Sequence, residues 1–85
     1  MREEIENYCK RNGINCLFAD GFDKAIIGLG ACFHSYKVVY DKQKVIDILC
    51  EEMDYEEAIE YFDFNIIGAY VGDETPVFLE DLNEL

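Results

Sequence analysis

The spacing of apolar residues predicts a short helix at the start of the chain. Within residues 2–11, Ile5, Tyr8 and Cys9 recur at the i, i+3, i+4 spacing of one helix face. Acidic residues stand at the start of this segment and basic residues at its end, which is the arrangement that the helix dipole favours. The Asn-Gly pair that ends in Gly13 is typical of a left-handed helix stop.

Three β-strands are predicted next, the first from a period of two that places Ile14, Cys16 and Phe18 on one side and Leu17 and Ala19 on the other. They cover residues 14–20, 25–29 and 36–40. The Asp20-Gly21 pair can supply the positive φ angles of a tight turn, so we expect a hairpin between the first two. Short connections favour an antiparallel meander.

The helical period returns after Asp41, which is a good N-cap residue. The predicted inner positions of this helix are Val45, Ile46, Leu49, Cys50 and Met53. A second helix is predicted to begin at Asp54, because Asp54 and Glu57 form a variant of the capping box. Its predicted inner positions are Tyr55, Ala58, Ile59, Phe62 and Ile66.

The chain ends with a turn and a short strand. Gly68 marks the end of the second helix, and residues 72–76 form a turn that precedes a strand over 77–79. Pro76 places that strand at a sheet edge. The predicted order is α-β-β-β-α-α-β. It describes one α+β domain over residues 1–85, a two-layer structure in which helices cover an antiparallel sheet of three to four strands.

Charge is distributed very unevenly along the chain. The net charge is −12, from seven basic and nineteen acidic residues. All seven bases and six acids lie within residues 1–44, which sum to +1, whereas residues 45–85 hold thirteen acids and no base. One half is close to neutral and the other is strongly anionic.

The charge excludes some partners and favours others. Nucleic acid and anionic membranes are disfavoured as direct partners, because binding a polyanion requires clustered Lys and Arg. A basic protein surface is the natural complement of such an anion. The alternative is that the acidic residues serve only solubility.

The candidate partner-binding site is the acidic second helix. Glu56, Glu60 and Asp63 follow i, i+4, i+7 spacing on its outward face, with Glu57 beside them and Glu52 just before. Neighbouring carboxylates stand about 6 Å apart on such a face, similar to the phosphates along a nucleic-acid strand. This ridge could therefore occupy a nucleic-acid-binding groove of another protein, or it could be an ordinary solvated helix face.

Two aromatic residues lie off the predicted inner face of this helix. Tyr61 and Phe64 stand three positions apart, beside the acids. Exposed, they would serve as partner-binding anchors. The alternative, which the small size of the domain favours, is that they pack in the core.

The residue pattern contains no catalytic, cofactor-binding or metal-binding signature, so we expect a non-enzymatic protein without cofactor or metal. Of the four cysteines, Cys32 and His34 form the one close Cys/His pair, and two ligands do not make a structural zinc site. Buried, reduced thiols are the better interpretation. The chain shows no secretory signal and no apolar run of the ~18–20 residues that a membrane span needs, so a cytoplasmic location is expected.

Parts of the chain resemble a known group of proteins. The segments 54–62, 64–65, 68–72 and 75–78 (EAIEYF-FN, GAYVG and TPVF), together with 20–28, are similar to small bacteriophage- and prophage-encoded proteins of unknown activity. Small acidic phage proteins include inhibitors of host defence nucleases, among them anti-CRISPR proteins that mimic DNA. The resemblance implies a location in the host cytoplasm, and it adds a host defence effector to the candidate partners.

Three functions are compatible with the sequence. The leading hypothesis is a non-enzymatic inhibitor that docks its acidic helix on a basic protein groove. The second is an assembly module that forms a homodimer through the 76–79 strand edge or the aromatic residues. The third is a small-ligand sponge, which would need a pocket around Lys24 and Lys37 to accept nucleotide-like anions.

Overall fold

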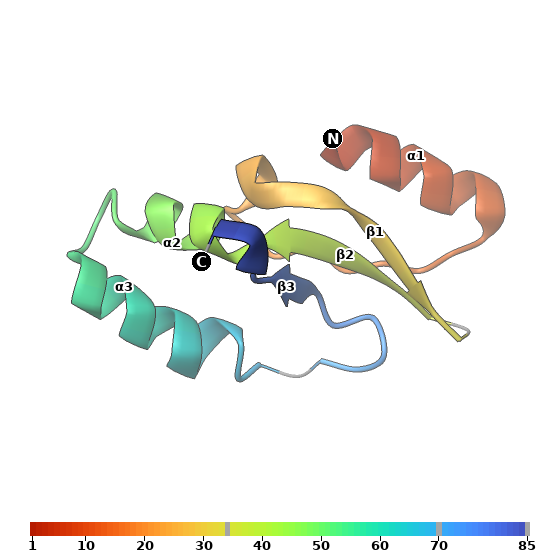
Figure 1. Ribbon diagram of the computed structural model, residues 1–85. Helices are drawn as coiled ribbons and strands as arrows, with labels where there is room; N and C mark the ends of the chain where they lie inside the picture. The colour runs from red at the N-terminus through yellow and green to blue at the C-terminus, as the bar shows by residue number, and fades with distance from the viewer. Residues whose placement is uncertain (34, 70, 85) are drawn as a thin grey trace.

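The computed structural model describes residues 1–33, 35–69 and 71–84 and shows a small α+β fold (Figure 1). The helices and strands of these residues are α1 (Arg2–Asn12), β1 (Ile26–Cys32), β2 (Ser35–Asp41), α2 (Lys42–Leu49), α3 (Tyr55–Tyr61) and β3 (Val77–Leu79). A π-helical segment, Phe62–Ile66, continues α3, and short 3₁₀ turns cover Asp23–Ala25 and Leu82–Glu84.

The strands of the described residues form one mixed sheet in the order β1-β2-β3. β1 and β2 are an antiparallel pair with an irregularity between Ile26 and Gly28, whereas β3 runs parallel to β2. The prediction that all neighbouring strands are antiparallel is therefore wrong for β2 and β3. The chain leaves the end of β2 through α2 and α3 and crosses back along the sheet before it enters β3 in the direction of β2. Such a helical crossover produces a parallel pair.

The first predicted strand, residues 14–20, is also wrong. These residues run as an irregular segment, and the apolar side chains of Ile14, Cys16 and Phe18 pack against the core without joining the sheet. Gly21 has the positive φ expected at a turn, 90°, but the turn leads into the 3₁₀ segment instead of a hairpin. Burial of every second side chain against the core is thus enough to produce the strand-like period of residues 14–20, although no strand lies alongside.

Three predicted helix boundaries are confirmed, the stop at Gly13 and the N-caps at Asp41 and Asp54. Gly13 closes α1 in the left-handed region, with φ 63°. The Asp41 carboxylate accepts hydrogen bonds from the backbone N–H groups of Gln43 (2.9 Å) and Lys44 (3.3 Å). Asp54 accepts one from Glu57 (2.8 Å). Each cap satisfies backbone donors that the first turn of a helix leaves without a partner.

Two positions that were predicted to face inward are exposed. Tyr55 is 59% exposed, and Cys50 lies on the surface because α2 ends at Leu49, one residue earlier. The other predicted inner positions of both helices are buried or half-buried.

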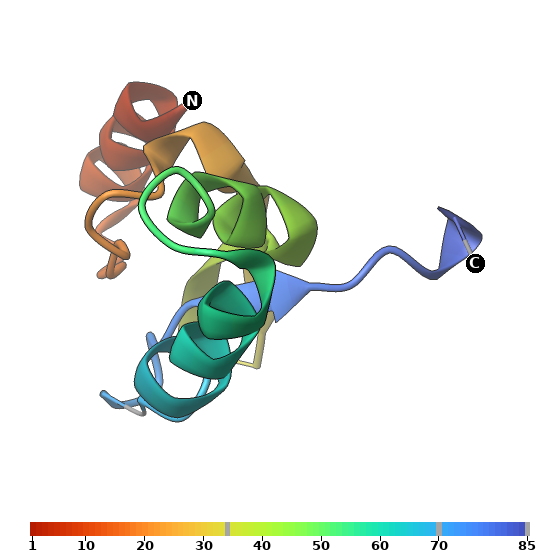
Figure 2. The ribbon, with the colours of Figure 1, turned by 90° about the vertical axis from the view of Figure 1, so that its left-hand side faces the viewer.

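The core lies between the helices and one face of the sheet. Its largest fully buried side chains are Tyr40, Phe62, Val38 and Val45. The ring of Phe78 stacks on Tyr40 with centroids 5.4 Å apart and meets Phe62 edge-on at 5.3 Å. Figure 2 shows α1, α2 and α3 gathered to one side, while the segment after β3 extends away from the rest of the chain. The expected two-layer α+β arrangement is confirmed.

The hydroxyl of the buried residue Tyr40 links the irregular segment of residues 14–20 to the sheet. It accepts a hydrogen bond of 2.7 Å from the backbone N–H of Ala19.

We expect Tyr40→Phe to reduce the free energy of unfolding by about 1–3 kcal/mol, because the backbone N–H of Ala19 then loses its hydrogen-bond acceptor. Urea denaturation measures the change. Tyr36→Phe, on the same strand and half-buried, is the control and should cost less than about 0.5 kcal/mol; equal losses would contradict this account.

Candidate protein-binding face

Helix α3 and its π-helical continuation bury only a narrow stripe. Ala58 and Phe62 are fully buried, and Ile59 and Ile66 are half-buried. The remaining described residues from Tyr55 to Ile67 are exposed. Most of the circumference of this helix is therefore available to a partner.

The predicted acidic residues all lie on this exposed surface. Glu56, Glu57 and Glu60 belong to α3, Asp63 to the π-helical segment, and Glu52 to the turn before α3. Among the described residues, no basic group comes within 4.0 Å of any of these five carboxylates. The ion pairs of the described residues involve other acids: the N-terminal amino group pairs with Glu4, Arg2 with Glu6 and Asp23, and Lys42 with Glu80.

The helical spacing that predicted a straight row of acids changes after Tyr61. The backbone N–H of Ile67 donates to the carbonyl of Phe62 (2.9 Å), a bond that spans five residues in place of the usual four. Glu56 and Glu60 keep α-helical spacing, but Asp63 and Phe64 lie in this wider turn. Such π-helical turns occur frequently at functional sites.

The aromatic residues of the site face solvent. Tyr61 is 43% exposed and Phe64 is 80% exposed, so the prediction that they pack in the core is wrong. Together with Glu57 and Glu60 they line a shallow depression of about 300 Å³, which Met53 and Asn65 complete. The structure thus brings two of the predicted acids and both predicted aromatic anchors to one surface, which we call the α3 face, flanked by Glu52, Glu56 and Asp63.

The carboxyls at the start of α3 influence one another. A side-chain hydrogen bond to the Asp54 carboxylate, followed by the negative charge of that residue, raises the pKa of Glu57 above its ordinary value. The pKa of Asp54 is lowered, chiefly because its carboxylate accepts the backbone N–H of Glu57. The α3 face therefore includes one carboxyl that takes up a proton more readily than an isolated glutamate.

A larger, apolar groove lies next to the α3 face, and the sequence reasoning missed it. Its volume is about 390 Å³, and its walls come from residues 17–22, the end of the π-helical segment, the 69–76 loop and β3. Phe18, Phe22, Ile66 and Phe78 contribute apolar surface, and Asp20 is its charged lining residue. Asn65 lines both the groove and the depression on the α3 face.

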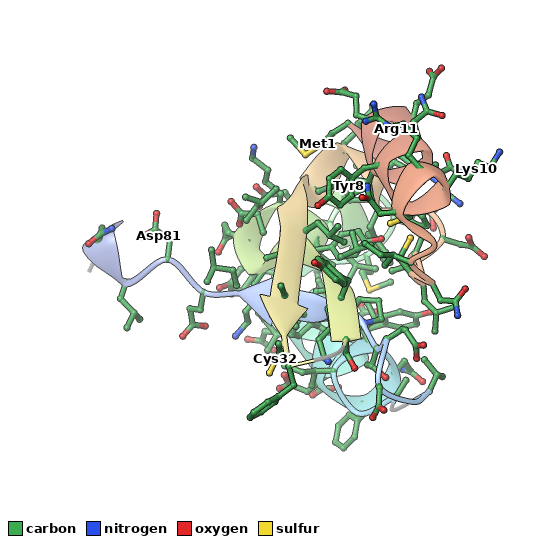
Figure 3. The ribbon with its side chains drawn as sticks, turned by 90° about the vertical axis from the view of Figure 1, so that its right-hand side faces the viewer. Met1, Tyr8, Lys10, Arg11, Cys32 and Asp81 are labelled. Atoms are coloured by element: carbon green, nitrogen blue, oxygen red, sulfur yellow. The ribbon has the colours of Figure 1, made fainter. Side chains whose placement is uncertain are left out.

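The thiols are only partly buried, unlike the prediction. Cys9 is buried and Cys16 half-buried, but Cys32 and Cys50 are exposed. Desolvation, followed by a hydrogen bond with Cys9, raises the pKa of Cys16 to about 11. Figure 3 places Cys32 at the end of β1, and its predicted neighbour His34 lies outside the described residues.

The part of the chain that the structure describes holds neither a cluster of metal ligands nor a membrane-spanning helix. No group of three or more His, Cys, Asp or Glu side chains is arranged to hold a metal ion. No helix there is long and apolar enough to span a membrane.

Comparison of the chain with protein-family models, with curated proteins and with solved structures finds no match.

The raised pKa of Glu57 is directly measurable. In an NMR titration of the side-chain carboxyls, we expect the pKa of Glu57 to lie above the ordinary value of a glutamate. Asp54→Asn should lower the pKa of Glu57 toward that ordinary value, because the hydrogen bond to the Asp54 carboxylate and then its negative charge are removed. The control Asp47→Asn, on α2, should leave it unchanged. A Glu57 pKa that is the same in the wild type and in Asp54→Asn would contradict the proposed coupling.

Proposed function

We propose that the protein is a non-enzymatic binding protein that docks its α3 face on a basic surface of another protein. The observation that carries this proposal is the row of exposed carboxylates without a basic partner among the described residues. Ordinary exposed helices mix charges of both signs, which lowers self-repulsion. Here the repulsion is left in place, and a cationic partner would relieve it.

The spacing of the acids favours a particular kind of partner. Glu56 and Glu60 stand one turn apart on α3, at the ~6 Å separation of i, i+4 neighbours. A protein groove that binds the phosphates of a nucleic acid has complementary charge at similar intervals. We therefore propose a nucleic-acid-binding protein as the partner, and, in line with the phage resemblance, a defence effector in the host cytoplasm.

The aromatic residues would supply the apolar part of the contact. Phe64 is the more exposed of the two, and Glu57 and Glu60 lie beside it around the same depression. An exposed aromatic side chain surrounded by charge is typical of an interface anchor. Charge would speed encounter and set orientation, and burial of Tyr61 and Phe64 would slow dissociation.

A triple charge reversal tests this proposal. We expect Glu56→Lys/Glu60→Lys/Asp63→Lys to weaken binding of a ten-residue oligolysine peptide at least about tenfold in calorimetric titration at moderate salt, which is about 1.4 kcal/mol. The fold should persist in circular dichroism, because all three side chains are exposed.

The matched control reverses three acids on separate elements, Asp47, Glu74 and Asp81. Both triple variants change the net charge from −12 to −6. We expect the control to lose less than about threefold in affinity, which is about 0.7 kcal/mol. If the two variants lose affinity equally, net charge alone determines binding and the α3 face is not a site.

A second candidate function, binding of a small molecule, is favoured by the groove next to the α3 face. A volume of about 390 Å³ falls within the range of ligand pockets, which is ~300–1,000 Å³. The charged group in its lining is Asp20, so the groove suits a neutral or cationic apolar ligand. The Lys37 amino group, part of the pocket expected for anions, donates to the backbone carbonyl of Asp73.

Three indole compounds that differ in charge test this second function. We expect tryptamine, a cation, to shift the NMR amide signals of Ala69 and Thr75 more than indole does, and indole-3-acetate, an anion, to shift them least. Ala69→Phe, which fills the groove, should remove the tryptamine effect. Equal responses to all three compounds, or no response, would exclude a ligand site of this chemistry.

A further inference from the structure

Two of the four cysteines lie next to each other at the end of α1. Cys9 is in the last turn of α1, belongs to the core cluster and is 4% exposed. Cys16 is in the irregular segment and packs against the same cluster. The side chain of Cys16 makes a hydrogen bond with that of Cys9. The two thiols are therefore neighbours in the folded chain, although six residues separate them in the sequence.

The turn that ends α1 explains this proximity. Gly13, in the left-handed region, and Ile14 both donate their backbone N–H groups to the carbonyl oxygen of Cys9, Ile14 at 2.9 Å. Such a helix stop reverses the chain, and Figure 1 shows the segment after α1 running back in the direction opposite to the helix. The alternation of side chains in this segment then turns Cys16 to the same side as Ile14, toward the core and Cys9.

A depression beside α1 gives a small reagent access to the pair. Its volume is about 580 Å³, and both thiols line it, together with side chains of α1 and of the loop before β3 that include Glu6, Lys10 and Glu74. This volume falls within the ~300–1,000 Å³ range of ligand pockets. Cys16 is half-buried and Cys9 is buried, so a reagent in this depression meets Cys16 first.

We propose that a low-molecular-weight disulfide oxidises Cys9 and Cys16 to an intrachain disulfide within the folded protein. The Cys16 thiol loses its proton, and its sulfur attacks one sulfur of the reagent, whose other half leaves as a thiolate. The Cys9 sulfur, after losing its proton, then attacks the sulfur of Cys16 and releases the second half. In total the two cysteines lose two protons and two electrons, and the reagent takes them up to become two thiols.

The geometry makes the first of these steps slow and the second fast. Desolvation and the hydrogen bond with Cys9 raise the pKa of Cys16 to about 11, and the thiolate is the attacking species. Once Cys16 carries half of the reagent, Cys9 is already beside it, with an effective concentration of the order of millimolar or more. The mixed disulfide at Cys16 therefore resolves within the chain instead of accumulating.

Tryptic digestion of the oxidised wild-type chain tests the proposal, because each of the four cysteines lies in a different tryptic peptide: 3–10, 12–24, 25–37 and 45–85. The folded chain is incubated with about 1 mM oxidised and about 0.1 mM reduced glutathione, and remaining thiols are alkylated before digestion. We expect peptides 3–10 and 12–24 to be joined, in at least about tenfold excess over Cys16 that carries glutathione. Cys32 and Cys50, which are exposed, are the internal controls and should carry glutathione.

Two variants assign the two steps. Cys9→Ala should remove the joined peptides and leave glutathione on Cys16, because the resolving thiol is missing. Cys16→Ser, at a half-buried position, should remove them as well and leave Cys9 as a free thiol, because Cys9 is buried.

The fold of the oxidised chain is checked by NMR. The amide signals of the buried residues Val38 and Val45 should be the same in the reduced and the oxidised protein. Absence of the joined peptides, or their formation only together with loss of these signals, would overturn the proposal. No residue of the α3 face takes part, so the result is independent of the proposed function.

Discussion

The contact of Phe78 with Tyr40 and Phe62 joins the two halves of the chain. Tyr40 comes from the nearly neutral half, and Phe62 and Phe78 come from the anionic half. β3 has only three residues, so its parallel pairing contributes few hydrogen bonds. The burial of one aromatic ring against two others, worth several kcal/mol together with ring geometry, is what holds β3 and the end of α3 against the sheet. The α3 face and the apolar groove both depend on that position.

The sequence was sufficient to predict the features that depend on neighbouring residues. The caps at Asp41 and Asp54 and the left-handed stop at Gly13 require only the residues of one turn, and they are where the pattern placed them. The alternation in residues 14–20 was misread, because the period of a strand shows which side chains are buried but not whether another strand lies alongside. The parallel direction of β3 likewise depends on the path of the intervening helices.

The candidate site likewise combines features that could be predicted from the sequence with features that could not. Five exposed carboxylates could be predicted, since unpaired charge is almost never buried. The exposure of Tyr61 and Phe64 could not be predicted, because it depends on how much of the α3 surface packs against the rest of the protein. The observed packing buries only a stripe about one residue wide. The groove was also beyond prediction, because its walls come from segments about 50 residues apart in the chain, which tertiary packing alone brings together.

The placement of charge explains how so acidic a chain can fold and still carry unpaired acids. Glu80 and Asp23, near the sheet and α1, have basic partners. The five carboxylates of α3 and the turn before it have none among the described residues, and they lie at the surface, where water and salt screen their repulsion and it costs least. That position also leaves their charge available to a cationic partner.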